Sequence, residues 1–231
     1  MATEAQAAGT FRLAHEFYKG GEKSTNKSYY GTGKTTNWLS QHVINLEEGA
    51  DPTQKQQGRN AQTLRNMDAA RADARSYQIN AGKTPYEIGA TLYLQQNTRG
   101  NCGEMAAVAM YLAYAGAHVP ADEITLWTLM RKVKGGFFSK DRSFGHSFAV
   151  LGNGEAGESW AVDPWANFYC RVSEFSVTLT RKLEYWTRIG KRIAAEMPEG
   201  PCWVEPTNEM ITAILGEIVI FDKVGLNEKG R

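Results

Sequence analysis

The sequence predicts an α+β fold in which helices precede an antiparallel sheet. Residues 102–115 form an alanine-rich, apolar run that ends at Gly116, a pattern typical of a buried helix stopped by glycine. Residues 146–151 and 159–163 are short β-prone runs on either side of the turn-rich loop 152–157, which favours a hairpin. We therefore expect the sheet to pack against the apolar helix.

A second helix is predicted just before the apolar one. Thr84 can cap its start, Pro85 fits the first helical position, and Glu87 can complete a capping box with Thr84. This helix is expected to run to about Gln96 and to lead the chain toward Cys102.

Other elements are predicted from the spacing of apolar residues. Residues 120–134 are expected to form an amphipathic helix. Residues 175–180 alternate apolar and polar side chains, which favours another strand, and the spacing within 183–193 favours a helix after it. Residues 61–77 resemble an exposed helix, while 211–221 is apolar and fits either a helix or a strand.

The chain of 231 residues can hold one large domain, or a core with an extension. We expect a polar, partly flexible N-terminal segment over residues 1–60 and the main, catalytic domain over 61–231. The glycines and Lys34 within residues 31–36 do not make a phosphate-binding loop, because Ser28 stands where that motif needs glycine.

The formal net charge of +1 gives no electrostatic reason to expect nucleic acid or an acidic membrane as a partner. No signal peptide or membrane-spanning run is visible. The cysteines, Cys102, Cys170 and Cys202, are an odd and sparse set that suits a reducing compartment. No CxxC motif or His/Cys cluster indicates a metal, so we expect neither metal nor cofactor.

Cys102 has the surroundings of a nucleophile. It follows a Gly-Asn turn and opens the apolar helix, and helix N-termini favour the thiolate form of cysteine. Gly100 and Gly103 would let a substrate approach the backbone, and the Cys102 N–H could donate to an oxyanion. Glu104 acts against the thiolate unless it points away. The alternative is an ordinary core cysteine.

The predicted hairpin supplies a base and a group to orient it. Folded about its central loop, the hairpin places Ser159 opposite Val150 and Asp163 opposite His146. Residues that face each other across strands lie on one side of the sheet, so Asp163 could hold one ring nitrogen while the other faces the thiol. A register slip of one residue would separate the two side chains. The alternatives are a solvated histidine and an ordinary strand-ending turn.

Three motifs together resemble a known family. They are Gly-Asn-Cys-Gly-Glu-Met-Ala at residues 100–106, Gly-His-Ser-Phe-Ala-Val at 145–150 and Trp-Ala-Val-Asp-Pro-Trp at 160–165. This set resembles the transglutaminase-like branch of the papain-like cysteine hydrolase superfamily, and most closely the bacterial toxins and effectors that deamidate glutamine. The resemblance covers roughly residues 84–170.

The resemblance implies a papain-like or transglutaminase-like core, with the nucleophile helix packed on an antiparallel sheet. It assigns the nucleophile to Cys102, the general base to His146 and the orienting acid to Asp163. The residues that would contact the substrate or its oxyanion are less well defined, and the candidates are Asn101, Gln95, Gln96 and Trp165.

The leading functional hypothesis is deamidation of a glutamine side chain in a host protein, through a thioester on Cys102. Such a protein would be a bacterial effector or toxin, injected into the host cytoplasm. Transamidation and peptide-bond cleavage use the same three residues and remain open. An acyltransferase is more remote, as is a binding module that has no catalysis. The oligomeric state and the target protein stay open.

Overall fold

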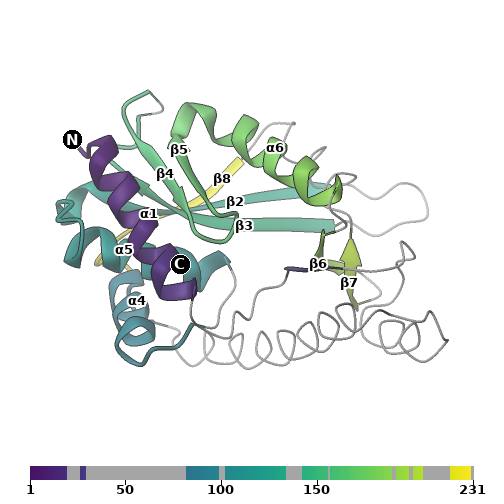
Figure 1. Cartoon of the computed structure of the whole chain (residues 1–231), viewed down its shortest axis with the longest axis horizontal. Coiled ribbons are helices and arrows are strands. Elements are labelled where there is room, and N and C mark those ends of the chain that lie inside the picture. The colour runs from purple at the N-terminus through teal and green to yellow at the C-terminus, as the bar shows by residue number, and fades with distance from the viewer. Residues whose placement is uncertain are drawn as a thin grey trace.

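The computed structural model describes residues 1–19, 27–29, 82–98, 102–133, 142–155, 157–188, 191–197, 200–204 and 219–229. Its helices are α1 (Glu4–Lys19), α4 (Pro85–Leu94), α5 (Cys102–Ala115) and α6 (Phe175–Arg188), with the short 3-10 turns η1 (Ala121–Glu123) and η2 (Val172–Glu174). These helices are combined with two antiparallel sheets, so the predicted α+β class is confirmed (Figure 1).

The larger sheet has five antiparallel strands in the order β5-β4-β3-β2-β8. They are β2 (Ile124–Val133), β3 (Arg142–Leu151), β4 (Trp160–Asp163), β5 (Phe168–Arg171) and β8 (Val219–Gly225). The smaller sheet has the order β1-β6-β7, formed by β1 (Lys27–Tyr29), β6 (Lys191–Met197) and β7 (Gly200–Val204).

Helix α5 occupies the centre of the described structure. It lies against β2, β3 and β4 and is flanked by α1 and α4. Its small residues Ala106, Ala109 and Ala113 are completely buried. A helix that is covered on several sides has no polar face, which explains why the sequence from Met105 onward is apolar all round.

Helices α4 and α5 approach each other at backbone distance. A Cβ built on Gly89 of α4 would lie 2.1 Å from the carbonyl oxygen of Ala107 in α5. Only a glycine can occupy such a position without moving one of the helices. Gly89 therefore fixes how closely α4 packs against the helix that begins at Cys102.

The predicted start of α4 is confirmed in detail. The Thr84 hydroxyl accepts from the Glu87 backbone N–H at 3.3 Å, and the Glu87 carboxylate accepts from the Thr84 N–H at 2.8 Å. Pro85 is the first helical residue. The helix ends at Leu94, slightly before the expected end at Gln96, whose φ of +53° cannot continue a right-handed helix.

The helix predicted over residues 120–134 is wrong, because most of this segment forms strand β2. Strand β2 is paired with β3 along its whole length and with β8 on its other side. Its β-branched and aromatic residues, such as Thr125, Trp127 and Thr128, favour this pleated environment. Strand β2 has apolar residues on both faces, Ile124 and Leu126 on one and Trp127 and Leu129 on the other, and such spacing can imitate that of a helix.

The strand predicted over residues 175–180 is also wrong, because this segment begins helix α6. The buried residues Phe175, Leu179, Leu183 and Trp186 follow helical spacing over about three turns. That longer pattern outweighs a short alternation. The helix predicted over 183–193 therefore starts earlier and ends at Arg188, and the chain enters β6 at Lys191.

The N-terminus departs from the polar, partly flexible segment expected over residues 1–60. Its residues Glu4–Lys19 form α1, which buries Ala7, Thr10, Ala14 and Tyr18 and packs on α5. The predicted domain boundary near residue 60, the loop 31–36 and the helix expected over 61–77 lie outside the described residues. Of the ambiguous run 211–221, the described part enters β8.

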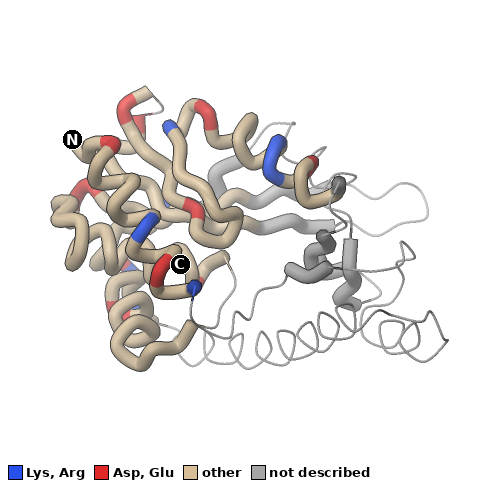
Figure 2. Tube along the Cα trace, viewed as in Figure 1, with Lys and Arg blue, Asp and Glu red and all other residues tan. Residues whose placement is uncertain are grey.

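Charged side chains of both signs are interspersed along the described trace (Figure 2). None of the helices in the described ranges is long and apolar enough to cross a membrane.

Candidate active site

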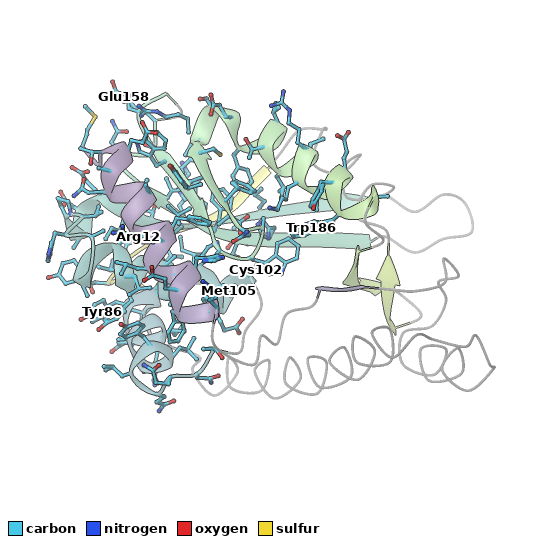
Figure 3. All side chains as sticks on the ribbon, viewed as in Figure 1. Arg12, Tyr86, Cys102, Met105, Glu158 and Trp186 are labelled. Carbon is cyan, nitrogen blue, oxygen red and sulfur yellow. The ribbon has the colours of Figure 1, made fainter. Side chains whose placement is uncertain are left out.

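Cys102 is the first residue of α5. Its side chain is half-buried and borders the hydrophobic cluster that joins α5 to the large sheet and to α6. Figure 3 shows Cys102 at the end of α5 near the middle of the molecule. The first N–H groups of a helix have no acceptor within the helix, so backbone donors are available beside the sulfur. Glu104, the nearby acid, is buried in the first turn of α5.

His146 and Asp163 form a buried hydrogen-bonded pair. His146 lies within β3 and Asp163 ends β4, and the distance from His146 Nε2 to Asp163 Oδ2 is 2.7 Å. The two side chains are 1% and 0% exposed. The second carboxylate oxygen, Oδ1, accepts from the backbone N–H of Ala166 at 2.9 Å. Each oxygen of Asp163 therefore holds a different part of the site.

The strand register differs from the predicted one by two residues. Val150 pairs with Ala161 instead of Ser159, and continuing this register places Asp163 opposite Phe148. Because side chains alternate with a period of two, the shift keeps Asp163 on the face that carries His146, as a diagonal neighbour. The two predicted residues meet, although they are not directly opposite.

Ser159 explains the shift in register. Its hydroxyl accepts from the Gly154 N–H at 2.9 Å and lies 3.2 Å from Asn153 Oδ1, so Ser159 closes the loop and does not pair with Val150. Gly152, with φ of +118°, turns the chain tightly beside it, since its Cβ position lies 2.9 Å from the Ser159 hydroxyl.

The imidazole of His146 is strongly biased toward its charged form. Burial acts to lower the pKa of His146, but the charge and hydrogen bond of Asp163, followed by those of Cys102, raise that pKa to about 10. His146 is therefore an imidazolium at neutral pH. Since Asp163 occupies Nε2, the ring nitrogen left to face Cys102 is Nδ1.

The described geometry thus brings together a thiol, an imidazole and a carboxylate. Cys102 and Asp163 both interact with His146, one from α5 and one from β4. A thiol, an imidazole and a carboxylate that interact in this order are the groups that covalent catalysis by cysteine uses. The hydrogen bond of Asp163 fixes the orientation of the ring.

Trp165 lies at this site. It is 2% exposed, and the centroid of its ring is 4.9 Å from that of His146. Trp165 was predicted as a candidate for contact with the substrate or oxyanion, whereas in the structure its ring packs against the imidazole.

The other candidates are not brought to the site by any described contact. Gln95 and Gln96 are exposed at the end of α4. The side chain of Gln96 donates to the nearby Tyr93 carbonyl at 3.1 Å, which is a local contact. Asn101 lies outside the described residues.

Phe175 also lies beside the imidazole, although the sequence did not indicate it as a site residue. Its ring is stacked on Phe148 at 3.9 Å and lies 6.3 Å from the ring of His146, nearly parallel to it. Phe175 was placed in a predicted strand, so its relation to His146 was hidden. The helical spacing from Phe175 to Trp186 is the signal that would have placed it on the inner face of α6.

The other cysteines differ from Cys102. Cys170 in β5 is buried, and burial raises its pKa to about 11, so its thiol stays protonated at neutral pH. Cys202 belongs to β7. In the described ranges, no group of three or more His, Cys, Asp or Glu side chains has the arrangement of a metal site.

Comparison with family models, curated proteins and solved structures finds no match to this chain. The three sequence motifs and the geometry of Cys102, His146 and Asp163 are therefore the observations that bear on the function of this protein.

Proposed function

We propose that this protein is a cysteine-dependent amidohydrolase that deamidates a glutamine side chain of a host protein, as a bacterial effector or toxin. The observation that carries the proposal is the buried His146–Asp163 pair, joined to a cysteine at the first residue of a helix. The three motifs that resemble the transglutaminase-like branch of the papain-like superfamily support a core of that type.

In the first half of the reaction, the Cys102 thiolate attacks the carbon of the glutamine carboxamide. A carbon–sulfur bond forms, and the carbonyl electrons move to oxygen. The N–H of Cys102 at the helix start is a suitable donor to this oxyanion. When the oxyanion collapses, the carbon–nitrogen bond breaks and imidazolium His146 protonates the departing nitrogen. Ammonia leaves, and a thioester and a neutral imidazole remain.

In the second half, water attacks the thioester. Neutral His146 accepts a proton from the water as the carbon–oxygen bond forms, and the carbon–sulfur bond then breaks. The products are a glutamic acid side chain, which releases its proton to solvent to become glutamate, the Cys102 thiolate and the imidazolium. Asp163 keeps the ring aligned in both halves through its hydrogen bond to Nε2, so the proton transfers would run through Nδ1.

Transglutaminase and cysteine protease activities are the alternatives with the same chemistry. An amine in place of water would give a cross-linked or amine-modified glutamine, and a backbone amide in place of a carboxamide would give chain cleavage. These outcomes depend on which groups reach the thioester, and the three residues serve all of them equally.

Mass spectrometry of candidate host proteins, incubated with the wild type and with Cys102→Ala, tests the proposal. A glutamine-to-glutamate mass change that requires Cys102 supports deamidation. An amine adduct or cross-link, or a new chain end, would replace deamidation with transamidation or proteolysis. Full activity of the folded Cys102→Ala or His146→Ala variant would exclude the mechanism.

A further inference from the structure

The turn between β4 and β5 begins at Asp163 and ends in a residue with an unusual backbone conformation. Asp163 pairs directly with Phe168, so residues 164–167 make the whole connection. Oδ1 of Asp163 accepts from the Ala166 N–H at 2.9 Å and closes the turn from the inside. Asn167 has a φ of +63°, a left-handed conformation that costs free energy in any residue with a side chain. Such a conformation persists where the surrounding structure supports it.

Helix α6 provides this support through Lys182. The Lys182 Nζ donates to the carbonyl oxygen of Asn167 at 3.4 Å. Helix α6 lies beside β5, the strand that leaves the turn (Figure 1). Leu183, the next residue of α6, is completely buried, so the helix is anchored at the position from which Lys182 extends. The hydrogen bond therefore connects an anchored part of α6 to the end of the turn.

The ammonium of Lys182 stays at the turn although this position costs it hydration. Lys182 is half-buried, and burial lowers the pKa of its ammonium, while the charge of Asp163 acts in the opposite direction. A lysine on a helix surface can extend its charged head into water. For Lys182, the Asn167 carbonyl and the nearby carboxylate of Asp163 compensate part of the lost hydration.

We propose that Lys182 is a positioning residue for Asp163: its ammonium holds the end of the β4–β5 turn against α6, so that the Asp163 carboxylate keeps the orientation in which it binds His146. The inference rests on the proposed function for the roles of Asp163 and His146. In the described contacts Lys182 does not bind His146 itself, so it acts on the imidazole through the turn.

The charge of Lys182 and its hydrogen bond have opposite effects on His146. A second cation near Asp163 repels the imidazolium, so loss of that charge alone would raise the pKa of His146. Loss of the hydrogen bond would loosen the turn and weaken the bond between Asp163 and His146, which would lower the pKa of His146 from its value of about 10. The sign of the change therefore separates positioning from charge repulsion.

The other titratable groups around the pair must stay in place for this comparison. Cys102 of α5 interacts with His146 directly, and Cys170 of β5 lies within electrostatic reach of Asp163. Glu174 of η2 lies within electrostatic reach of Cys170. Substitutions confined to the exposed and half-buried positions of α6 leave all of these groups unchanged.

Three variants give the comparison. Lys182→Met removes the ammonium and keeps a side chain of similar length, whereas Lys182→Arg keeps a charged donor. Arg181→Met is the matched control, because Arg181 is the preceding residue of α6, is exposed, and its loss changes the net charge by the same amount. His146→Gln identifies the signal of His146 among the four histidines of the chain.

Nuclear magnetic resonance reports on the pair without any substrate. It follows the solvent exchange of the Nε2 proton that His146 donates to Asp163, and the pH midpoint of the ring signals. For Lys182→Met we expect exchange about fivefold faster, as for the loss of one ordinary hydrogen bond. We expect the midpoint to fall by about half a pH unit, less than the shift caused by a partner in direct contact. Lys182→Arg and Arg181→Met should behave as the wild type.

A folded Lys182→Met variant with unchanged or slower exchange, or with an unchanged or higher midpoint, would overturn the proposal. Failure of Lys182→Arg to restore the wild-type values would also overturn it. So would equal changes in Arg181→Met, because the effect would then come from the net charge of α6. If Lys182→Met does not fold, the same measurements on Lys182→Gln decide instead, since its shorter side chain stays polar but falls short of the turn.

These results are separable from a failure of the proposed function. If no target glutamine is modified but Lys182→Met changes exchange and midpoint as expected, the positioning role stands and the substrate assignment falls. If deamidation is found but Lys182→Met behaves as the wild type, the proposed function stands and the positioning role falls.

Discussion

The two halves of the candidate site are built in different ways. Cys102 stands at the end of a helix whose packing depends on small residues and close backbone contact, as at Gly89 and Ala107. His146 and Asp163 form a polar pair surrounded by large rings. Cys102 is therefore placed by the position of a whole helix, whereas His146 is placed by one hydrogen bond and its aromatic surroundings. Substitutions should affect the two halves differently.

The largest expected effect separates Cys102 from Cys170. Cys102 is half-buried beside an imidazolium, while Cys170 is buried with its pKa raised to about 11. At neutral pH we expect iodoacetamide to modify Cys102 at least about a hundredfold faster than Cys170, since the thiolate is the reactive form. Peptide mapping after timed alkylation measures both rates. Equal rates, or an inert Cys102, would remove the case for an activated thiol.

Asp163→Ala should cause the largest loss of stability. It leaves a buried histidine without its partner and the Ala166 N–H without its acceptor, which costs about 3–5 kcal/mol when a buried pair is broken. Chemical denaturation gives the free energy of unfolding. Asp163→Asn is the matched control, because it keeps the size and one acceptor oxygen but loses the charge, and it should be less destabilising. A cost near zero for Asp163→Ala would contradict the buried pair.

The same pair predicts a dependence of stability on pH. The pKa of His146 is about 10 in the folded protein, above its ordinary value of 6.5, so the folded state binds the proton more tightly. The stabilisation is complete below pH 6.5 and is lost as the pH rises through about 10. Unfolding free energies measured across this range should fall for the wild type, and the fall should be smaller for His146→Gln. Identical curves for the two proteins would argue against a charged imidazole.

In the half of the candidate site that contains Cys102 and α5, Gly89→Ala should lower the free energy of unfolding by about 1–3 kcal/mol, as for overpacking of a tight core. Its methyl group would collide with the Ala107 carbonyl and push α4 and α5 apart. Gly103→Ala is the control, because its Cβ position is free of contacts within 4 Å and alanine favours a helix. Thermal unfolding compares the two variants. If both were tolerated equally, the close approach of the helices would be disproved.

The smallest expected effect lies at the start of α4. Thr84→Ala removes the hydroxyl that caps the helix and should cost about 1 kcal/mol. Thr84→Ser keeps the hydroxyl and should be nearly neutral. The difference between these variants in thermal unfolding isolates the cap. A loss as large for serine as for alanine would show that the methyl group matters more than the hydrogen bond.

Sequence patterns predicted best where local chemistry decides the structure. The start of α4 at Thr84 and the start of α5 at Cys102 follow from capping and turn residues, and both are confirmed. The meeting of His146 with Asp163 followed from side-chain alternation, although the register was wrong by two residues because Ser159 closes the loop. The error did not separate the two side chains, because a register shift by an even number of residues leaves each side chain on the same face of the sheet.

The sequence patterns predicted the wrong element where contacts between distant parts of the chain determine the secondary structure. Strand β2 has apolar residues on both faces, Ile124 and Leu126 on one and Trp127 and Leu129 on the other, and their spacing imitated a helix. Helix α6 was hidden by a short alternation at its first turn. The aromatic surroundings of His146 could not be predicted, because Trp165 and Phe175 reach the imidazole from a turn and a helix whose relative placement only the fold determines.

The packing of α1 on α5 has a consequence for where this chain can be divided. Ala7, Ala14 and Tyr18 of α1 are buried, and Ala109 and Ala113 of α5 depend on neighbouring elements to exclude water. A truncated protein that begins at residue 61 would lose this cover and expose the side of α5. The first nineteen residues are thus an integral part of the scaffold for Cys102, and a fragment that keeps the surroundings of Cys102 must retain them.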